Sequence, residues 1–266
     1  MPIITAAPSA EDKATVPHKL FEIFAPDFRG NVIDWLKRAT EAIRQTWQEG
    51  KMPIVVGGTG LYIDSLINGA SPIPETPAHI RAKVQKMINE GRLPLIYEEL
   101  KKADPESARK LNPNDASRVK RAYEVYLDTQ KLISEWHKEP LTNYLPEAKY
   151  FVIKICPPAE ELDARAFIRF DKMVEEGALD EVQKLFKRKL PADLPSMKAL
   201  GVPELMDYFN GKTNIYVAVQ NAKLHTRQYA KRQRTWFKNK LQADLTIPTC
   251  YQGNFPPEII ALLKSM

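Results

Sequence analysis

Apolar side chains at helical spacing predict the first long helix of the chain. They recur through residues 31–48, at Val32, Ile33, Leu36, Ala39, Ile43 and Trp47, and Gly50 ends the helix. The apolar run Met52–Val56 then predicts a buried strand, Gly57–Gly60 a glycine turn, and Leu61–Ile67 a further helix. Because strand, glycine turn and helix form the repeating unit of parallel α/β sheets, the expected fold class is α/β.

A proline-rich segment marks a change in the pattern. Ser71–Pro77 carries three prolines, and the residues from 78 to 139 show only helical signals. Helices are predicted at 78–89, 95–102 and 117–128, with further helix starts at Asp104-Pro105 and Asn112–Asp115. These signals predict an α/β core domain of residues 1–75 and 147–266, interrupted by an all-helical insertion of residues 76–146.

Strand character returns after the insertion. Tyr150–Ile155 predicts a strand, and a long amphipathic helix begins near Pro157 and ends near Gly177. Asp244–Pro248 predicts a last strand and Pro256–Leu263 a terminal helix.

The composition excludes several classes of protein. Hydrophobic residues make up 44% of the 266 residues, which is enough for a core and argues against a disordered chain. No apolar run reaches the length of about 18 residues that a membrane span needs. Two cysteines are too few for a disulfide framework or a structural zinc site. With no signal-peptide pattern at its start, the chain is expected to be soluble and cytoplasmic, with no membrane partner.

The net charge of +6 is concentrated in one segment. Residues 223–240 carry seven Lys and Arg side chains and no acidic one. The segment has no Pro or Gly and is predicted to be a helix, with Arg227, Lys231, Arg234 and Lys238 on one face. Like charges at this spacing destabilise a helix, so a bound anion would explain them. A merely solvated face is the alternative.

The glycine turn is the other candidate for chemistry. Its glycines would let a ligand approach the backbone, and the following helix would direct N–H groups at an anion or polar atom. Thr59 supplies one hydroxyl there, although a tight turn with a capping threonine explains the same residues. The motifs GxxxxGK[ST], GxGxxG and HExxH are absent, and the four histidines have no metal-binding spacing. The sequence therefore predicts no metal site built from its own side chains.

Five stretches resemble, in order, the motifs of bacterial tRNA dimethylallyltransferases. They are Thr5–His18, Pro53–Leu66, Leu111–Ala122, Ser196–Glu204 and Thr226–Phe237, and together they extend the resemblance from about residue 3 to residue 240. The resemblance implies a nucleotide-binding, P-loop-like α/β core with an inserted helical domain. It also implies transfer of a dimethylallyl group from its diphosphate to the N6 amine of the adenosine 3′-adjacent to the anticodon.

The resemblance implies partners and site residues as well. The partners would be the tRNA anticodon stem-loop, dimethylallyl diphosphate and Mg²⁺ bound through that diphosphate, with no organic cofactor and a monomeric enzyme. Thr59 would bond the flipped adenine, and Arg227 would face the diphosphate. The residues implied to contact tRNA are Arg81, Ser117, Arg118, Val119, Lys120, Arg121, Lys198, Ala199, Leu200, Gly201, Val202, Pro203, Lys231, Arg232, Gln233, Arg234, Thr235, Trp236, Phe237 and Lys238.

The sequence departs from the family at its beginning. Family members start with a strand, a GPTxxGK[ST] loop that holds the prenyl diphosphate, a helix and a second strand with an Asp-Ser pair that supplies the expected base. Asp64-Ser65 is no substitute, because it lies within the helix after the glycine turn. A start codon assigned too late is the favoured explanation, ahead of an artificially shortened chain and a non-catalytic RNA-binding remnant.

On this basis we expect the 266-residue chain to be inactive in prenyl transfer and poorly stable, because a parallel sheet without its central strands exposes its core. A nucleotide kinase of the same ancestry would share the fold, but it would leave the basic helix unexplained.

Overall fold

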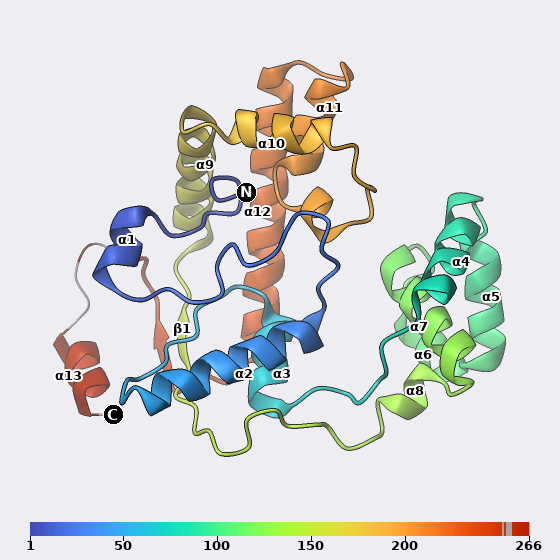
Figure 1. Cartoon of the computed structure of the whole chain (residues 1–266), viewed down its shortest axis with the longest axis horizontal. Helices are drawn as coiled ribbons and strands as arrows, with labels where there is room; N and C mark the ends of the chain where they lie inside the picture. The colour runs from blue at the N-terminus through green and yellow to red at the C-terminus, as the bar shows by residue number, and fades with distance from the viewer. Residues whose placement is uncertain (252, 254–256, 266) are drawn as a thin grey trace. The chain divides into compact units, whose positions relative to one another are not determined.

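The chain folds into two compact units (Figure 1). The computed structural model describes residues 1–251, 253 and 257–265. One unit comprises Met1–Asp64 and Leu145–Met266, and the other comprises Ser65–Tyr144. The predicted core domain and insertion overlap these units without sharing their limits. Among the described residues, no helix combines the length and apolar character that a membrane crossing requires.

The first unit is mainly helical. Its helices before the second unit are α1 (Ala10–Thr15), α2 (Val32–Gln48) and the first part of α3 (Gly60–Asn68), which continues into the second unit. After the second unit follow β1 (Ile153–Ile155), α9 (Ala159–Glu175), α10 (Ala178–Lys187), a short 3₁₀ turn η1 (Pro195–Lys198), α11 (Val202–Phe209), α12 (Ile215–Lys240), β2 (Leu245–Ile247) and α13 (Pro257–Ser265).

Local sequence signals account for most of these helices. The predicted helix at 31–48 is confirmed as α2, where the Asn31 side chain accepts hydrogen bonds from the backbone N–H groups of Ile33 and Asp34. The amphipathic helix after Pro157 and the basic helix are confirmed as α9 and α12. The terminal helix is confirmed as α13 from Pro257 onwards, and residue 256 of the predicted range lies outside the described residues.

A small parallel sheet pairs β1 with β2. Ile153 lies opposite Leu245 and Ile155 opposite Ile247, within the predicted strands Tyr150–Ile155 and Asp244–Pro248. At the start of the pair, the Val152 backbone N–H donates to an Asp244 carboxylate oxygen at 2.7 Å. The protein is therefore a helix-rich α/β protein, as far as the described residues go.

The predicted buried strand Met52–Val56 is wrong. This segment pairs with no described strand, and Ile54 and Val56 are 74% and 84% exposed. An apolar run becomes a buried strand only where a neighbouring strand takes up its backbone hydrogen bonds and a layer covers its side chains. Neither neighbour is present among the described residues.

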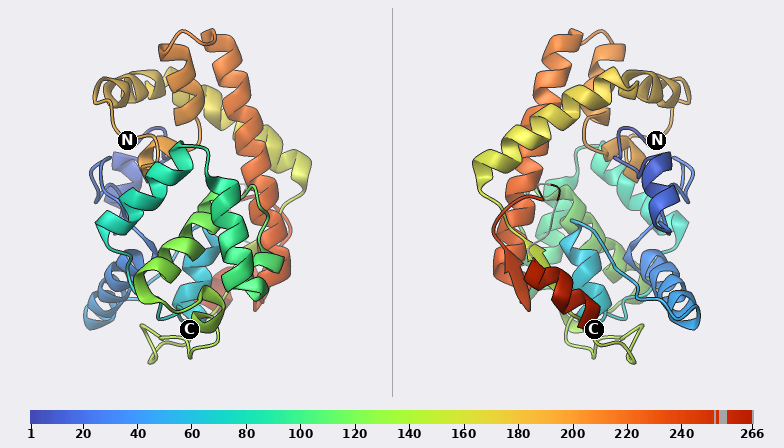
Figure 2. Two further views of the ribbon diagram at one scale, coloured as in Figure 1. Left: turned by 90° about the vertical axis from the view of Figure 1, so that its right-hand side faces the viewer. Right: turned by 90° about the vertical axis from the view of Figure 1, so that its left-hand side faces the viewer.

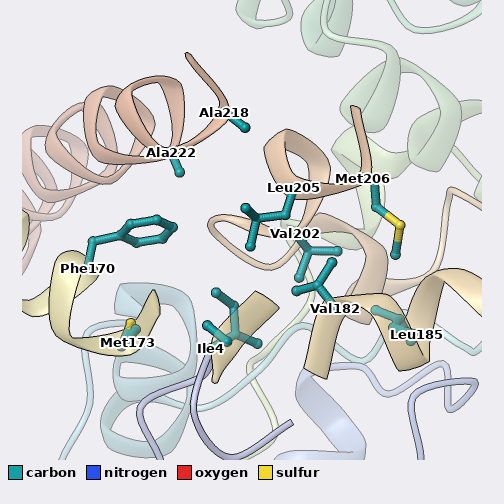
Figure 3. Close-up of a cluster of buried hydrophobic side chains, with 11 residues drawn as sticks. Ile4, Phe170, Met173, Val182, Leu185, Val202, Leu205, Met206, Ala218 and Ala222 are labelled. Carbon is teal, nitrogen blue, oxygen red and sulfur yellow. The ribbon is translucent and has the colours of Figure 1, made fainter. Parts of the chain in front are cut away.

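The core of the first unit forms where α12 packs against α9 and α11, and α10 packs against α11 and α9 (Figure 3). Ala218 and Ala222 on α12 are fully buried and small, so the neighbouring helices approach closely. Gly201 precedes α11 at a φ of +88°, and a Cβ there would lie 2.7 Å from a ring carbon of Phe170. The other buried side chains of this cluster are Ile4, Met173, Ala178, Val182, Leu185, Val202, Leu205 and Met206.

The second unit is a bundle of short helices: α4 (Ala78–Asn89), α5 (Leu93–Ala103), α6 (Pro105–Lys110), α7 (Ala116–Thr129) and α8 (Ile133–Trp136). Helix α7 contacts α4, α5 and α8. The buried hydrophobic cluster of the second unit consists of Val84, Ile96, Leu100, Val119, Ala122 and Tyr123. Near the two ends of the unit, the backbones of Ala70 and Thr142 exchange hydrogen bonds of 3.0 and 2.8 Å, which close the bundle.

Asp104 joins two helices of this bundle. The side chain is 2% exposed, and its carboxylate accepts a hydrogen bond from the Ser107 N–H at the start of α6 and another from the Ser134 N–H of α8. Burial alone would raise the pKa of Asp104, but the hydrogen bonds from Ser107 and Ser134 outweigh it and hold this pKa below its usual value.

We expect Asp104→Ala to lower the free energy of unfolding by about 1–3 kcal/mol, because it leaves buried N–H groups without acceptors. Asp104→Asn keeps one acceptor oxygen and should cost less. Since the folded-state pKa is lowered, the advantage of the wild type over Asp104→Asn is present at neutral pH and is lost as the pH falls through that pKa. Urea unfolding followed by circular dichroism at several pH values measures the stability of each variant and its pH dependence. A stability difference between the wild type and Asp104→Asn that does not change with pH would contradict the lowered pKa of Asp104.

Candidate functional site

Helix α12, the long orange helix of Figure 2, is the scaffold of the candidate site. Ion pairs anchor its first half. Lys223 Nζ lies 2.6 Å from an Asp171 carboxylate oxygen of α9, and Arg227 Nε lies 2.8 Å from Asp163 Oδ2 of the same helix. On the other side, the His225 ring hydrogen-bonds the buried Glu204 of α11. These contacts fix the direction in which the rest of α12 projects.

The second half of α12 carries cations without carboxylate partners. Lys231, Arg234 and Lys238 form no ion pair in the described part of the chain. Arg232 lies over the ring of Tyr229, with its guanidinium carbon 5.6 Å from the ring centre. A row of cations that the protein does not neutralise is available to a polyanion.

The glycine turn is seated directly on α12. Gln233 Nε2 donates a hydrogen bond of 2.9 Å to the Gly58 carbonyl oxygen. A Cβ on Gly60 would lie 2.3 Å from the indole ring of Trp236, so only glycine permits this approach. Sequence reasoning assigned Gln233 and Trp236 to tRNA and missed this role, since no local signal links residues 175 positions apart.

Thr59 lies exposed at the beginning of α3. Its carbonyl oxygen accepts hydrogen bonds from the N–H groups of Tyr62 and Ile63 at 3.0 and 3.3 Å. Its hydroxyl has no hydrogen-bond partner among the described residues, so it remains available to a ligand at a helix N-terminus. Ser65, further along the same helix, is buried at 5% exposure.

A shallow pocket of about 400 Å³ lies along the same part of α12. Lys231, Arg232, Thr235 and Trp236 line it, together with Asn239 and Lys240, which sequence reasoning did not select. Since Trp236 also touches Gly60, the pocket and the turn share a wall.

The structure distributes the remaining predicted residues of the first unit unevenly. Lys198 and Pro203 are exposed and can meet a ligand. Ala199 and Leu200 are partly buried, and Gly201 and Val202 are buried in the core around Phe170. For Val202, which is 0% exposed, the side chain contributes to packing and offers no surface.

In the second unit, the predicted cations are held by neighbouring polar groups. Arg121 donates to the Thr76 hydroxyl at 2.6 Å and to the Pro74 carbonyl at 3.3 Å, and burial lowers its pKa. Arg81 lies 3.1 Å from Glu75. Their guanidinium groups are therefore oriented before any ligand binds.

The neighbouring positions on α7 face different surroundings. Lys120 donates to Gln85 at 2.6 Å and lies 3.6 Å from the buried Glu124, whose pKa burial raises. Ser117 and Arg118 are exposed, whereas Val119 is 0% exposed and belongs to the core of the unit.

No three His, Cys, Asp or Glu side chains among the described residues gather where they could hold a metal ion. Arg227 is the residue predicted to bind the diphosphate, and the carboxylate of Asp163 beside it is paired with its guanidinium group. The described donors thus do not build a metal site of their own.

Comparison with known proteins gives a consistent result. The model of the "IPP transferase" family matches residues 1–240. The chain is 40% identical to the tRNA dimethylallyltransferase of Zymomonas mobilis over 238 residues, which cover 90% of this chain and 75% of that protein. It is 38% identical to the tRNA dimethylallyltransferase of Rickettsia massiliae, covering 96% of this chain and 70% of that protein.

Solved structures show the same similarity. The tRNA isopentenylpyrophosphate transferase of Bacillus halodurans aligns with a TM-score of 0.64 at 31% identity, over 100% of this chain and 82% of that chain. A eukaryotic dimethylallyltransferase acting on tRNA aligns with a TM-score of 0.71 at 28% identity, over 89% of this chain and 60% of that chain.

The contact between the turn and α12 can be tested by adding one methyl group. Gly60→Ala should lower the free energy of unfolding by about 1–3 kcal/mol, because the rigid indole of Trp236 must move. Gly57→Ala is the matched control in the same turn, since nothing lies within 4 Å of a Cβ there, and should change stability by less than about 0.5 kcal/mol.

A double-mutant cycle measured by urea unfolding identifies the partner. In a Trp236→Ala background, the added cost of Gly60→Ala should largely disappear, giving a coupling of about 1 kcal/mol or more. Additive effects of the two substitutions would show that the turn does not rest on Trp236.

Proposed function

Because the chain belongs to the IPP transferase family, we propose that it modifies tRNA by transferring a dimethylallyl group from dimethylallyl diphosphate to the N6 amine of the adenosine 3′-adjacent to the anticodon. It is a transferase that acts on tRNA, like the relatives it resembles over most of its length. The observation that carries the residue assignments is the seating of the glycine turn, with its available Thr59 hydroxyl, on the basic helix α12.

The bonds that form and break in the proposed reaction indicate a role for Thr59. A bond forms between N6 and the terminal carbon of the prenyl group, the bond from that carbon to the diphosphate oxygen breaks, and one proton leaves N6. The adenine must leave the stack of the anticodon loop to be reached. In the proposal, the Thr59 hydroxyl binds the N6 edge of the extruded base and orients its amine.

Arg227 is proposed as the cation that stabilises the departing diphosphate. In the structure its guanidinium is paired with Asp163 on α9, 2.8 Å away. A diphosphate would therefore compete with Asp163 for Arg227 or share it. We propose that the diphosphate binds together with Mg²⁺, which would offset part of its charge.

The anticodon stem-loop is proposed to lie along the second half of α12. Lys231, Arg234 and Lys238 would contact phosphates there, while Trp236 would offer an aromatic face. We assign the helical insertion of residues 76–146 to tRNA binding as well, through Arg81, Ser117–Arg121 and their neighbours. A P-loop-like core, a monomeric state and a cytoplasmic location complete the proposal.

The role of Thr59 is tested by removing its hydroxyl at nearly constant volume. With radiolabelled dimethylallyl diphosphate and tRNA, Thr59→Val should lower kcat by about 10²-fold while leaving tRNA affinity within twofold or so of the wild type. Thr59→Ser keeps the hydroxyl and should retain most of the activity. Equal rates for Thr59→Val and the wild type would remove Thr59 from the mechanism.

The wild-type chain is assayed first, and prenyl transfer by it would overturn the expectation that the 266-residue chain is inactive. If it binds the anticodon stem-loop selectively but transfers no prenyl group, the non-catalytic RNA-binding alternative replaces the proposal. A chain that neither binds nor modifies tRNA would contradict both.

The role of α12 is tested by its charge. Neutralising Lys231, Arg234 and Lys238 to Gln should weaken tRNA binding and reduce the slope of log K against log salt by about 2–3. The matched control neutralises three exposed lysines of the same unit, Lys172, Lys184 and Lys187, and changes the net charge equally. Anisotropy titrations over a salt series measure both, and identical slopes for the two triple variants would exclude a specific role of α12.

A further inference from the structure

The helical second unit contains a pocket that the transfer site does not use. It has a volume of about 620 Å³ and lies between α6, α7 and α8. This volume falls within the range of ordinary small-ligand pockets, which is about 300–1,000 Å³. Three helices and the residues after α8 contribute to it, so it belongs to the fold of the unit and does not depend on one mobile side chain.

The walls of the pocket divide into a cationic rim and an apolar floor. Leu111, Ala122 and Ile133 supply the floor. Lys110, Arg118, Arg121 and Lys138 bring four positive charges, and Ser107, Ser117 and Ser134 also line the pocket. The first turn of the 14-residue helix α7 borders the pocket at Ser117, where the helix dipole adds positive potential.

Glu106 is the one carboxylate among the described residues that line the pocket, while Arg118 pairs at 3.4 Å with Asp115, which does not line it. Glu106 accepts hydrogen bonds from Lys110 at 3.1 Å and from Lys138 at 2.7 Å, and these two lysines hold the pKa of Glu106 below its usual value. Glu106 therefore holds one cation of its own helix and one from the residues after α8, and it competes with any anionic ligand for them.

We propose that this pocket holds one unstacked nucleotide of the bound RNA, with the base on the apolar floor and a phosphate against Lys110, Lys138 and Arg118. The assignment rests on the proposed function, because it takes tRNA as the ligand. An aromatic base needs apolar surface to pack against and its phosphate needs cations, and the residues that line the pocket include both.

The exposure of the rim favours a nucleotide within an RNA chain over a free metabolite. The side chains of Lys110, Arg118 and Lys138 are 74%, 73% and 66% exposed. Pockets for free small molecules usually enclose most of the ligand surface. An open rim leaves room for the backbone of an RNA loop to enter and leave.

The decisive substitution is one that should improve binding. Glu106→Gln removes the competing charge and should tighten binding of the anticodon stem-loop by about threefold to tenfold at low salt. Glu98→Gln is the matched control, since Glu98 lies in the same unit, pairs with Lys101 and does not line the pocket. A misfolded variant cannot imitate a gain, which keeps the test independent of stability.

The complementary substitution is Lys138→Gln, compared with Lys101→Gln. The pocket variant should weaken RNA binding by about threefold to tenfold and lower the salt slope by about one, and the control should do neither. Equal effects of Glu106→Gln and Glu98→Gln, or of the two lysine variants, would overturn the pocket assignment while leaving the proposed function standing. Failure of the wild-type chain to bind the stem-loop at all would instead overturn the proposed function, and this inference with it.

NMR distinguishes binding of an RNA nucleotide in the pocket from binding of a free phosphate compound. His137 lines the pocket, and its ring resonance, assigned with His137→Gln, should shift on titration with the stem-loop. Inorganic phosphate and adenosine monophosphate should produce little shift at the same concentrations. If either shifts His137 as strongly as the RNA does, the pocket binds free phosphate compounds and the RNA assignment is wrong.

Discussion

The contact between the glycine turn and helix α12 is the constraint on which the candidate site depends. Gly58 offers its carbonyl to Gln233, and Gly60 lies where a single methyl group would meet Trp236. Close approach of a backbone to a large ring is possible only for a residue without a Cβ. The turn therefore sets the position of Thr59 relative to the basic helix.

The two halves of the 26-residue helix α12 have different roles. Its first half carries small buried alanines, Ala218 and Ala222, and pairs Lys223 and Arg227 with carboxylates of α9. The Arg227 side chain is 59% exposed, and exposed ion pairs contribute little to stability, typically about 0–1 kcal/mol, so the importance of this pair is in placement. The second half is left with cations that no described carboxylate neutralises, which is the arrangement a polyanion requires.

The second unit combines a satisfied and an unsatisfied buried carboxylate. Asp104 receives two backbone hydrogen bonds and ties α6 to α8, which form two walls of the pocket. Glu124 is 4% exposed, and its Oε1 has no hydrogen-bond partner among the described residues, although Lys120 lies 3.6 Å away. A buried carboxylate oxygen without a hydrogen bond lowers stability. Glu124 lies on α7, the helix that also carries Lys120 and Arg121. Departures from ideal packing tend to occur at binding surfaces.

The sequence by itself determined most of the helices and the helix starts at Asp104 and Asp115, since these rest on contacts within a few residues. It also determined the basic character of α12 and the family motifs, which can be identified from the residues alone. Only the tertiary structure decided that Met52–Val56 stays unpaired, that Val119 and Val202 are buried, and that Arg227 meets Asp163. It also decided that Gln233 reaches Gly58 across 175 positions of the chain. The physical reason is that a helix satisfies its own backbone hydrogen bonds locally, whereas a strand, a buried face or an ion pair requires a partner from a distant part of the chain.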